Sequence, residues 1–307
     1  MQEICTASQT ERQEKMEKLS NPQKTIEVIK KYDFAFQKKF GQNFLIDAHV
    51  LNKIIASADI TKDDCVLEIG PGIGTMTQYL AEAAGKVVAV EIDRNLIPIL
   101  SETLADYENV TVINEDVLKL DIAKLADEYN QGRPIKVVAN LPYYITTPII
   151  MKLLEDGVEA DSMTVMMQKE VADRMRAHPG TKAYGALSVA VQYYCEAEQV
   201  VNVPASCFVP QPKVDSAVLR LDMRTEPPVV LEDQDMFFRC VKAGFGQRRK
   251  TLSNALMGVE HMTKEIAGAS LAGAGIEPAR RAETLDLAEF ARLANEAAKR
   301  LANGQRG

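Results

Sequence analysis

The chain has 307 residues, of which 46% are hydrophobic and 26% are charged, and its formal net charge is -7. This length allows one large domain and a smaller one, and the composition is typical of a globular protein. The sequence contains no apolar run of about 18 residues or more, so we expect no transmembrane helix and a cytoplasmic protein.

Cysteine and histidine give no indication of a metal site or of disulfide bonds. The five cysteines form no Cys-x-x-Cys pair, and the three histidines are scattered along the chain. An odd cysteine count without paired spacing is typical of reduced, mostly buried thiols in the cytoplasm. The N-terminal residues lack a basic stretch followed by an apolar one, so we expect no secretory signal.

The predicted elements begin with a polar extension and two helices. Residues 1–22 are polar, and we expect them to be loosely ordered with some helix. Apolar side chains at helical spacing predict a short helix over residues 25–32 and a second helix over residues 47–58. Asp47 is a suitable N-cap for the second helix.

From residue 65 onward, short apolar strands alternate with helices. This alternation predicts right-handed crossovers and a mostly parallel sheet that is covered on both faces. Ligands of such sheets bind beyond the carboxyl ends of the strands, so the residues after each strand are the candidates for chemistry. Helices are predicted over residues 75–84 and 95–104, and strands over residues 65–69, 86–91, 110–113, 135–139 and 163–167.

The pattern changes after Gly185. Residues 187–203 and 215–223 are predicted as two long strands that form an antiparallel pair at one edge of the sheet. Glu226-Pro227-Pro228 then breaks the chain, and an Ala-, Leu- and Arg-rich region with helical spacing follows. We therefore expect an α/β fold with an N-terminal extension (1–34), a Rossmann-like sheet domain (35–225) and a smaller C-terminal α-helical domain (226–307).

A glycine-rich loop and two acidic residues follow the first three strands. Residues 70–74 read GPGIG, Glu91 ends the second strand, and Asp116 follows the third. The loop alone could be a tight turn, and either acid alone could be a solvated loop residue. Together they fit a nucleoside ligand, with Glu91 accepting from ribose hydroxyls and Asp116 from an adenine amine. The GxGxG spacing favours S-adenosylmethionine over NAD, which indicates a class I methyltransferase sheet.

The fourth strand leads into Asn140-Leu141-Pro142-Tyr143-Tyr144. An adenine amine is a poor nucleophile because its lone pair is delocalised into the ring, and acceptors aimed at both of its hydrogens would orient it. The side-chain oxygen of Asn140 can be one acceptor, and the backbone carbonyl of Leu141 or Pro142 can be the other. Tyr143 offers a flat face on which the base can stack. The alternative is a strand-terminating turn with buried tyrosines, which the preceding glycines and acids make the weaker interpretation.

These motifs and several others make the chain resemble the ribosomal RNA adenine dimethyltransferase family. That family includes the bacterial small-subunit enzyme linked to kasugamycin sensitivity and the erythromycin-resistance methylases. The resemblance covers roughly residues 35–300, and residues 182–185 and 245–251 point to the small-subunit enzyme. The matching stretches are 39–45 (KFGQNFL), 68–74 (EIGPGIG), 91–94 (EIDR), 115–116, 140–143 (NLPY), 168–171 (QKEV), 182–185 (KAYG), 208–217 (FVPQPKVDSA) and 245–251 (FGQRRKT).

The resemblance implies N6,N6-dimethylation of two adjacent adenines near the 3′ end of small-subunit (16S) ribosomal RNA, with S-adenosylmethionine, during ribosome biogenesis. Phe208 would stack on the second face of the target base, beside Asn140, Leu141, Pro142 and Tyr143. Tyr144 departs from the Asn or His common in the family, and we expect little effect from it. The residues implied to bind the cofactor are Gln42, Asn43, Leu45, Gly70, Gly72, Glu91, Ile92, Asp116, Val117 and Asn140.

Basic residues suggest how an acidic protein could bind RNA. Arg248, Arg249 and Lys250 lie in a stretch without acids, and the pairs Lys38-Lys39 and Arg280-Arg281 add to them. Each run could be an ordinary solvated face, but on a helical domain beside the sheet they would form a phosphate-binding stripe. We expect a monomer whose partner is ribosomal RNA in the immature small subunit.

Other functions remain open from the sequence. One is a large-subunit RNA adenine methylase that confers macrolide resistance, and another is a ribosome-assembly factor that binds without catalysis. A DNA adenine methylase is disfavoured by the loop before Tyr143.

Overall fold

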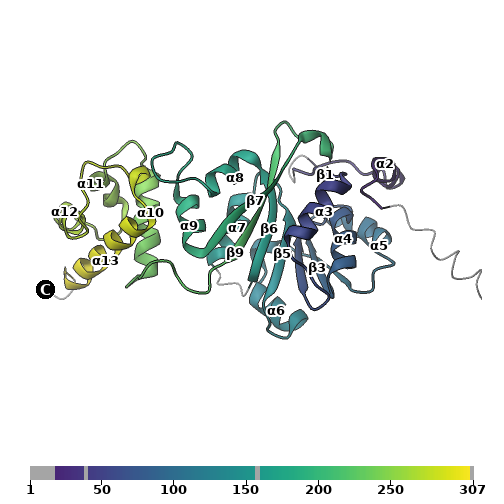
Figure 1. Cartoon of the computed structure of the whole chain (residues 1–307), viewed down its shortest axis with the longest axis horizontal. Helices are drawn as coiled ribbons and strands as arrows, with labels where there is room; N and C mark the ends of the chain where they lie inside the picture. The colour runs from purple at the N-terminus through teal and green to yellow at the C-terminus, as the bar shows by residue number, and fades with distance from the viewer. Residues whose placement is uncertain (1–17, 38–40, 156–159, 305–307) are drawn as a thin grey trace, which may run out of the picture.

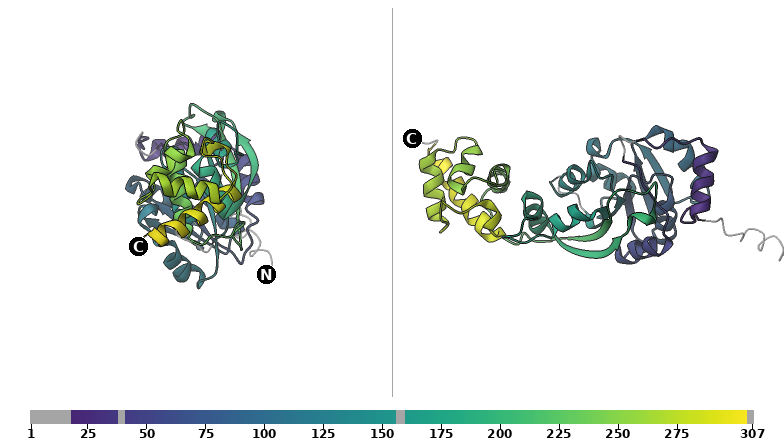
Figure 2. Two further views of the ribbon diagram at one scale, coloured as in Figure 1. Left: turned by 90° about the vertical axis from the view of Figure 1, so that its left-hand side faces the viewer. Right: turned by 90° about the horizontal axis from the view of Figure 1, so that it is seen from above.

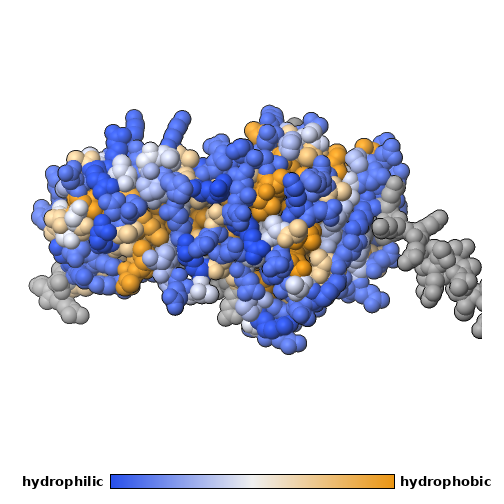
Figure 3. All heavy atoms as spheres, in the orientation of Figure 1, coloured by the Kyte–Doolittle hydropathy of each residue, from blue (hydrophilic) through white to orange (hydrophobic). Residues whose placement is uncertain are grey.

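The computed structural model describes residues 18–37, 41–155 and 160–304. A sheet region and a C-terminal helical region lie at opposite ends of an elongated molecule (Figure 1). Hydrophilic side chains cover most of the face shown in Figure 3, interrupted by apolar patches over both regions. None of the described helices is long and apolar enough to cross a membrane.

Among the described residues, seven strands form the main sheet in the order β4-β3-β2-β5-β6-β9-β7. The first five in this order are parallel, whereas β9 is antiparallel to both β6 and β7. The Rossmann-like α/β prediction is therefore confirmed. The bounds are β2 (Cys65–Ile69), β3 (Lys86–Glu91), β4 (Val110–Asn114), β5 (Ile135–Asn140), β6 (Ala160–Gln168), β7 (Cys195–Val203) and β9 (Ser216–Met223).

The central strands β2, β3 and β5 are mainly apolar because both faces of the sheet are buried there. On one face, Leu67 and Val137 pack under helices α6 and α7, while on the other Val66 and Val138 pack under α3 and α4. The chain leaves β2 in one direction along the sheet and returns to β5 on its other side, which places a ligand-binding crevice between the ends of β2 and β5. These helices are α3 (Ala48–Ser57), α4 (Thr75–Ala83), α6 (Ile122–Asn130) and α7 (Thr146–Glu155).

One predicted strand is wrong over half of its length. Residues 187–194 belong to helix α9 (Ala186–Tyr194), and only Cys195–Val203 forms strand β7. The reason is that α9 is buried on several sides: Leu187 and Val191 face the sheet core, and Val189 and Tyr193 face the helical region. A helix covered this way has no polar face, so its sequence lacks the helical period.

The C-terminal region consists of helices packed around an aromatic core. Phe237 and Phe290 are fully buried in this core, together with Tyr184 and Tyr193 from before residue 226. The predicted C-terminal helical region is present, and the division at residue 226 stays a prediction. The helices are α10 (Gln234–Gly246), α11 (Leu252–Ala255), α12 (Lys264–Gly273) and α13 (Leu287–Gly304).

The N-terminal extension carries helix α2 (Pro22–Lys31), which begins where Asn21 caps it and Pro22 occupies the first turn. Figure 2 shows α2 at the end of the molecule farthest from α10–α13. Further on, β1 (Phe44–Leu45) pairs with β8 (Phe208–Val209) in a separate two-stranded sheet. The predicted cap Asp47 accepts a hydrogen bond from the backbone N–H of Val50 at the start of α3.

Candidate active site

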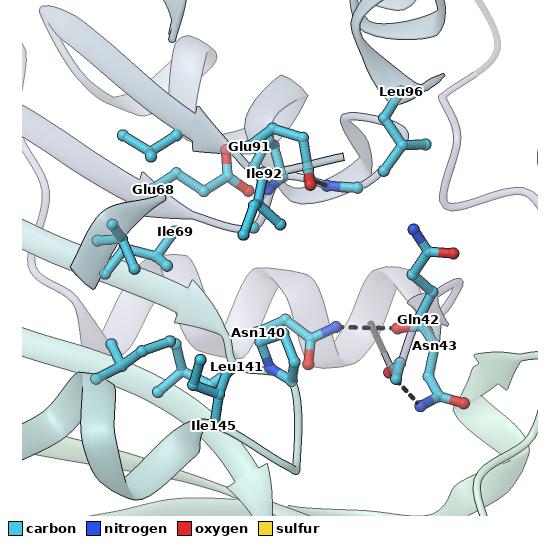
Figure 4. Close-up of a pocket in the computed structure, with 18 of the residues that line it drawn as sticks. Gln42, Asn43, Glu68, Ile69, Glu91, Ile92, Leu96, Asn140, Leu141 and Ile145 are labelled. Atoms are coloured by element: carbon cyan, nitrogen blue, oxygen red, sulfur yellow. Dashed lines mark hydrogen bonds between the residues drawn. The ribbon is translucent and has the colours of Figure 1, made fainter. Parts of the chain in front are cut away.

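One pocket lies beyond the carboxyl ends of β2, β3, β4 and β5, and most of the predicted site residues line it. Figure 4 shows Glu91 and Asn140 on opposite sides of its open centre, with Gln42 and Asn43 along a third side. Thirteen predicted residues meet here: Gln42, Asn43, Leu45, Gly70, Gly72, Glu91, Ile92, Asp116, Val117, Asn140, Leu141, Pro142 and Tyr143.

The glycine loop after β2 needs glycine for two reasons. Gly70 and Gly72 have φ angles of +70° and +62°, in the left-handed region that side chains disfavour. A Cβ atom on Gly72 would also lie 2.9 Å from a ring carbon of Phe44. The loop therefore presents bare backbone to the pocket, as a close-fitting ligand requires.

Glu91 is held by the backbone around it. Its Oε1 accepts from the N–H of Asp93 at 2.8 Å, and its Oε2 accepts from the N–H of Gly72 at 3.2 Å. The side chain is 5% exposed, and this burial raises the pKa of Glu91 to about 7, with the two backbone N–H groups acting in the opposite direction. The remaining lone pairs suit hydroxyl donors of a ribose.

Asp116 ends the next strand and caps a short 3-10 turn. Its Oδ1 accepts from the N–H of Leu118 at 3.0 Å, which leaves acceptor capacity toward the pocket. Val117 beside it is buried, and Ile92, which also lines the pocket, is exposed. These side chains provide an acceptor flanked by apolar surface, which suits a purine ring with an amine at its edge.

The amide of Asn140 is oriented by the segment before β1. Its Nδ2 donates to the backbone carbonyl of Asn43 at 3.1 Å, and the Asn43 side chain in turn donates to the carbonyl of Gly41 (Figure 4). With its nitrogen committed in this way, the Asn140 side chain presents Oδ1 as an acceptor. This is the polarity that the predicted capture of an amine hydrogen needs.

The structure distinguishes the two carbonyls left open by the sequence. The carbonyl of Pro142 already accepts from the N–H of Ile145 at 3.1 Å and from the hydroxyl of Thr146 at 3.0 Å, at the start of α7. Leu141 donates its N–H to the carbonyl of Met166 at 3.0 Å, which anchors the loop to β6. The geometry therefore favours the Leu141 carbonyl as the second acceptor.

The two tyrosines of the loop differ in environment. The hydroxyl of Tyr143 is 2.7 Å from Oγ of the buried Ser216, and burial raises the pKa of this phenol. Tyr144 is 55% exposed, lines the pocket mouth and lies beside Gly41. Tyr143 is thus a fixed side chain at the pocket, whereas Tyr144 is open to solvent.

The structure does not bring Phe208 to the pocket. Its side chain is 1% exposed and packs in the core with Val50 and Val203, while its backbone pairs with Leu45. In this arrangement the ring offers no face to a base, so the stacking role implied by the resemblance requires a movement of β8.

The sequence interpretation overlooked Glu68 as a site residue. It lies in β2, lines the pocket and is 0% exposed, and neither carboxylate oxygen has a hydrogen-bond partner among the described residues. Burial raises the pKa of Glu68 to about 8, and the charge of Glu91 adds to this effect, while the nearby Thr77 opposes it without reaching hydrogen-bond geometry. An acid inside an otherwise apolar strand was the available signal.

The predicted RNA-binding cations have different environments. Arg249 and Lys250 are exposed, but Arg248 donates to the carbonyls of Lys182 and Tyr184 at 2.9 and 3.0 Å. Arg280 is paired with Glu289 within the helical region. Lys38 and Lys39 lie outside the described residues.

Within the described residues, no group of three or more His, Cys, Asp or Glu side chains is arranged to hold a metal ion.

The chain is similar to known proteins over most of its length. A family model described as ribosomal RNA adenine dimethylase matches residues 33–299. Ribosomal RNA small subunit methyltransferase A of Alkaliphilus metalliredigens is 57% identical over 286 residues, which are 93% of this chain and 100% of the relative. The protein of the same name from Lachnoclostridium phytofermentans is 59% identical and covers 90% of this chain and 97% of its own length.

Two solved structures are similar over most of the chain. A dimethyladenosine transferase from Plasmodium falciparum has a TM-score of 0.70 and 29% identity, covering 83% of this chain and 98% of that one. The 23S rRNA methyltransferase ErmE has a TM-score of 0.62 and 30% identity, covering 83% of this chain and 100% of that one. The chain belongs to the ribosomal RNA adenine dimethylase family.

Proposed function

We propose that this enzyme uses S-adenosylmethionine to dimethylate N6 of two adjacent adenines near the 3′ end of small-subunit ribosomal RNA, in the cytoplasm and on an immature subunit. The observation that supports this most strongly is the orientation of Asn140. Its amide nitrogen donates to the carbonyl of Asn43, which leaves its oxygen as an acceptor for one hydrogen of the target amine. The Leu141 carbonyl is the proposed acceptor for the other hydrogen.

The residues present fit the cofactor. A Cβ atom on Gly72 would crowd Phe44, so the glycine keeps space open at the pocket. Glu68, which also lines the pocket, has two buried oxygens without a hydrogen-bond partner among the described residues. Gln42, Asn43 and Gly70 would hold the methionine part, Glu91 the ribose, and Asp116 with Val117 the adenine. When bound, the cofactor supplies an activated methyl group on a positively charged sulfur.

The chain itself prepares the nucleophile. Asn140 and the Leu141 carbonyl accept from the target amine and favour a tetrahedral nitrogen with an available lone pair. Tyr143, held by Ser216, provides the stacking surface for the flipped base. No base or metal is required, because the methylated ammonium can lose its proton to water.

The small subunit is favoured over the large one by the relatives. Those at 57–59% identity are named small-subunit methyltransferases, whereas the 23S rRNA methyltransferase ErmE is 30% identical. A purely non-catalytic assembly factor is disfavoured, because the complete acceptor pair and cofactor cradle would then have no use.

The first test uses labelled S-adenosylmethionine and small subunits from cells that lack this methylation, with modified bases mapped by mass spectrometry. We expect dimethyladenine near the RNA 3′ end, and at least a 100-fold loss of rate in Asn140→Ala, the scale seen when one preorganised hydrogen-bonding group is removed. Label on large-subunit RNA instead would support the resistance-methylase alternative. Absence of label on both subunits would support the assembly factor.

We also propose that Arg249 and Lys250 contact RNA phosphates. Charge reversal of both is expected to weaken subunit binding and to lower the slope of log affinity against log salt by roughly 1.4–1.8, since each of the two phosphate contacts contributes roughly 0.7–0.9. Arg248 is unsuitable for this test because its bonds to Lys182 and Tyr184 are structural. An unchanged salt slope would exclude this surface.

A further inference from the structure

The N-terminal strap, which we define as residues 18–37, contacts two residues that line the cofactor pocket, Phe44 and Gln42. One contact is part of an aromatic cluster and the other is part of a chain of hydrogen bonds. We propose that the strap is a working part of the cofactor site, in which Phe36 and Gln37 are positioning residues that set cofactor affinity. This rests on the proposed function only in taking S-adenosylmethionine as the cofactor.

The strap is docked by buried contacts on the outer helices of the sheet region. Leu19 and Val28 are 2% and 5% exposed and pack against the core formed by α5 (Ile97–Thr103) and neighbouring residues, and Thr25 is 0% exposed. The N–H of Leu19 donates to Oε1 of Gln78 in α4 at 3.1 Å, and the Thr25 hydroxyl donates to the carbonyl of Leu19 at 2.6 Å. The strap therefore has a defined position relative to the helix that follows the glycine loop.

Polar contacts around this buried patch orient the strap on the sheet region. Lys18 pairs with Glu82 at 2.7 Å, and both Lys31 and Tyr32 bind the carboxylate of Glu102 in α5. Exposed ion pairs of this kind contribute little free energy each. The buried residues supply the docking energy, and the rim contacts supply the direction in which the chain leaves α2.

The first route to the pocket is aromatic. Phe36 packs on Phe34 with ring centroids 5.6 Å apart at 80°, and on Phe44 with centroids 5.4 Å apart. Phe44 lies in β1, is 6% exposed, lines the pocket and occupies the space that a side chain on Gly72 would need. Since Phe44 follows Asn43, the carbonyl that orients Asn140 is positioned by the same cluster.

The second route is polar and reaches Glu91. The N–H of Gln37 donates to Oε1 of Gln42 at 2.9 Å, and the Nε2 atoms of both side chains donate to the carboxylate of Asp93. Asp93 is 3% exposed, and its own N–H donates to Oε1 of Glu91 at 2.8 Å. A continuous chain of hydrogen bonds therefore links the strap to the group that we assign to the ribose.

A strap that only stabilised the fold would need the buried contacts of α2. It would not need the aromatic contact of Phe36 with Phe44 or the hydrogen bonds of Gln37 with Gln42 and Asp93. Because α2 lies at the far end of the molecule from α10–α13 (Figure 2), changes in the strap are expected to leave RNA binding by the helical region unaltered. Cofactor affinity and RNA affinity therefore separate the two possibilities.

The test is calorimetric binding of S-adenosylhomocysteine to the full-length chain carrying Phe36→Ala or Gln37→Ala. We expect Kd to rise about tenfold in each, equivalent to about 1.4 kcal/mol, with a matching rise in KM for S-adenosylmethionine and unchanged KM for small subunits. Phe36→Leu, which keeps an apolar side chain, should recover part of the affinity. The control is Ile26→Ala, at an exposed position on α2, for which no change is expected.

Thermal unfolding of each variant shows whether it is folded. Kd within twofold of the original protein in both variants would overturn the proposal, whether or not Tm falls, and a lowered Tm would then leave the strap a stabilising element. Weakened binding of S-adenosylhomocysteine in a protein that methylates neither subunit would support the strap and reject the proposed function, so the two failures are distinguishable.

Discussion

Replacing Glu68 by Gln should change how stability depends on pH. In the unfolded chain the carboxyl has its ordinary pKa of 4.5, whereas burial holds the pKa of Glu68 in the folded protein at about 8. Between these values the folded state carries one proton more than the unfolded state, so the free energy of unfolding falls as pH rises, by about 1.4 kcal/mol per pH unit. Gln carries no titrating proton, so the free energy of unfolding of the variant lacks this decrease with pH.

The free energies of unfolding of the two proteins should therefore diverge with pH. Between pH 5 and 7 the Glu68→Gln variant should gain roughly 2–3 kcal/mol relative to the original chain, on top of any constant offset from altered hydrogen bonding. Burial also raises the pKa of Glu91, to about 7, so this carboxyl adds its own pH dependence in the same window. Both proteins carry Glu91, so its contribution cancels in the difference between them.

Urea unfolding at half-unit pH intervals measures the effect, with Glu108→Gln at an exposed position as the matched control. The control removes a carboxylate at the surface, so it separates the effect of burial at Glu68 from the effect of the substitution itself. If the original protein and the Glu68→Gln variant gave parallel stability curves from pH 5 to 7, the carboxyl would be ionised in the fold and the reasoning from burial would be refuted.

Two further substitutions test the geometry of the pocket. Gly72→Ala should weaken binding of S-adenosylhomocysteine by at least tenfold, measured by calorimetry, because the new Cβ combines a left-handed backbone with a 2.9 Å approach to Phe44. Ser216→Ala should lower kcat about three- to tenfold without changing cofactor affinity, because losing one hydrogen bond of about 1 kcal/mol frees the ring of Tyr143; an unchanged kcat would show that the ring is held by packing alone.

The sequence predicted the fold well where an element depends on turn residues, N-caps or hydrophobic periodicity within a short stretch of chain. The four strands from Cys65 to Asn140, the helices after the first two of them, the glycine loop and the cap at Asp47 were predicted, because turn residues, apolar runs and N-caps act over a few neighbours. Helix α6, between β4 and β5, was not predicted. Helix α9 was not predictable, because its burial on several sides comes from elements distant in the chain.

Within the candidate site, the sequence did not show which hydrogen-bond, ion-pair or packing partner each residue has. The sequence shows Arg280 as a cation but not that Glu289 neutralises it, and it shows two candidate carbonyls but not that α7 already uses the one of Pro142. Likewise, Phe208 reads as a motif residue, whereas its place in the core depends on strand pairing with Leu45. Such contacts join segments that are far apart in the chain, and no local pattern records them.

Because of helix α9, a domain boundary at residue 226 would not separate the chain into two units with independent hydrophobic cores. The helix contributes Leu187 and Val191 to the sheet core and Val189 and Tyr193 to the helical core. A fragment starting at residue 226 would lose that second pair and leave Phe237 facing water. The sheet region and the helical region are therefore expected to unfold in one cooperative transition. A chimera that exchanges the helical region between relatives would fold only if it also included α9.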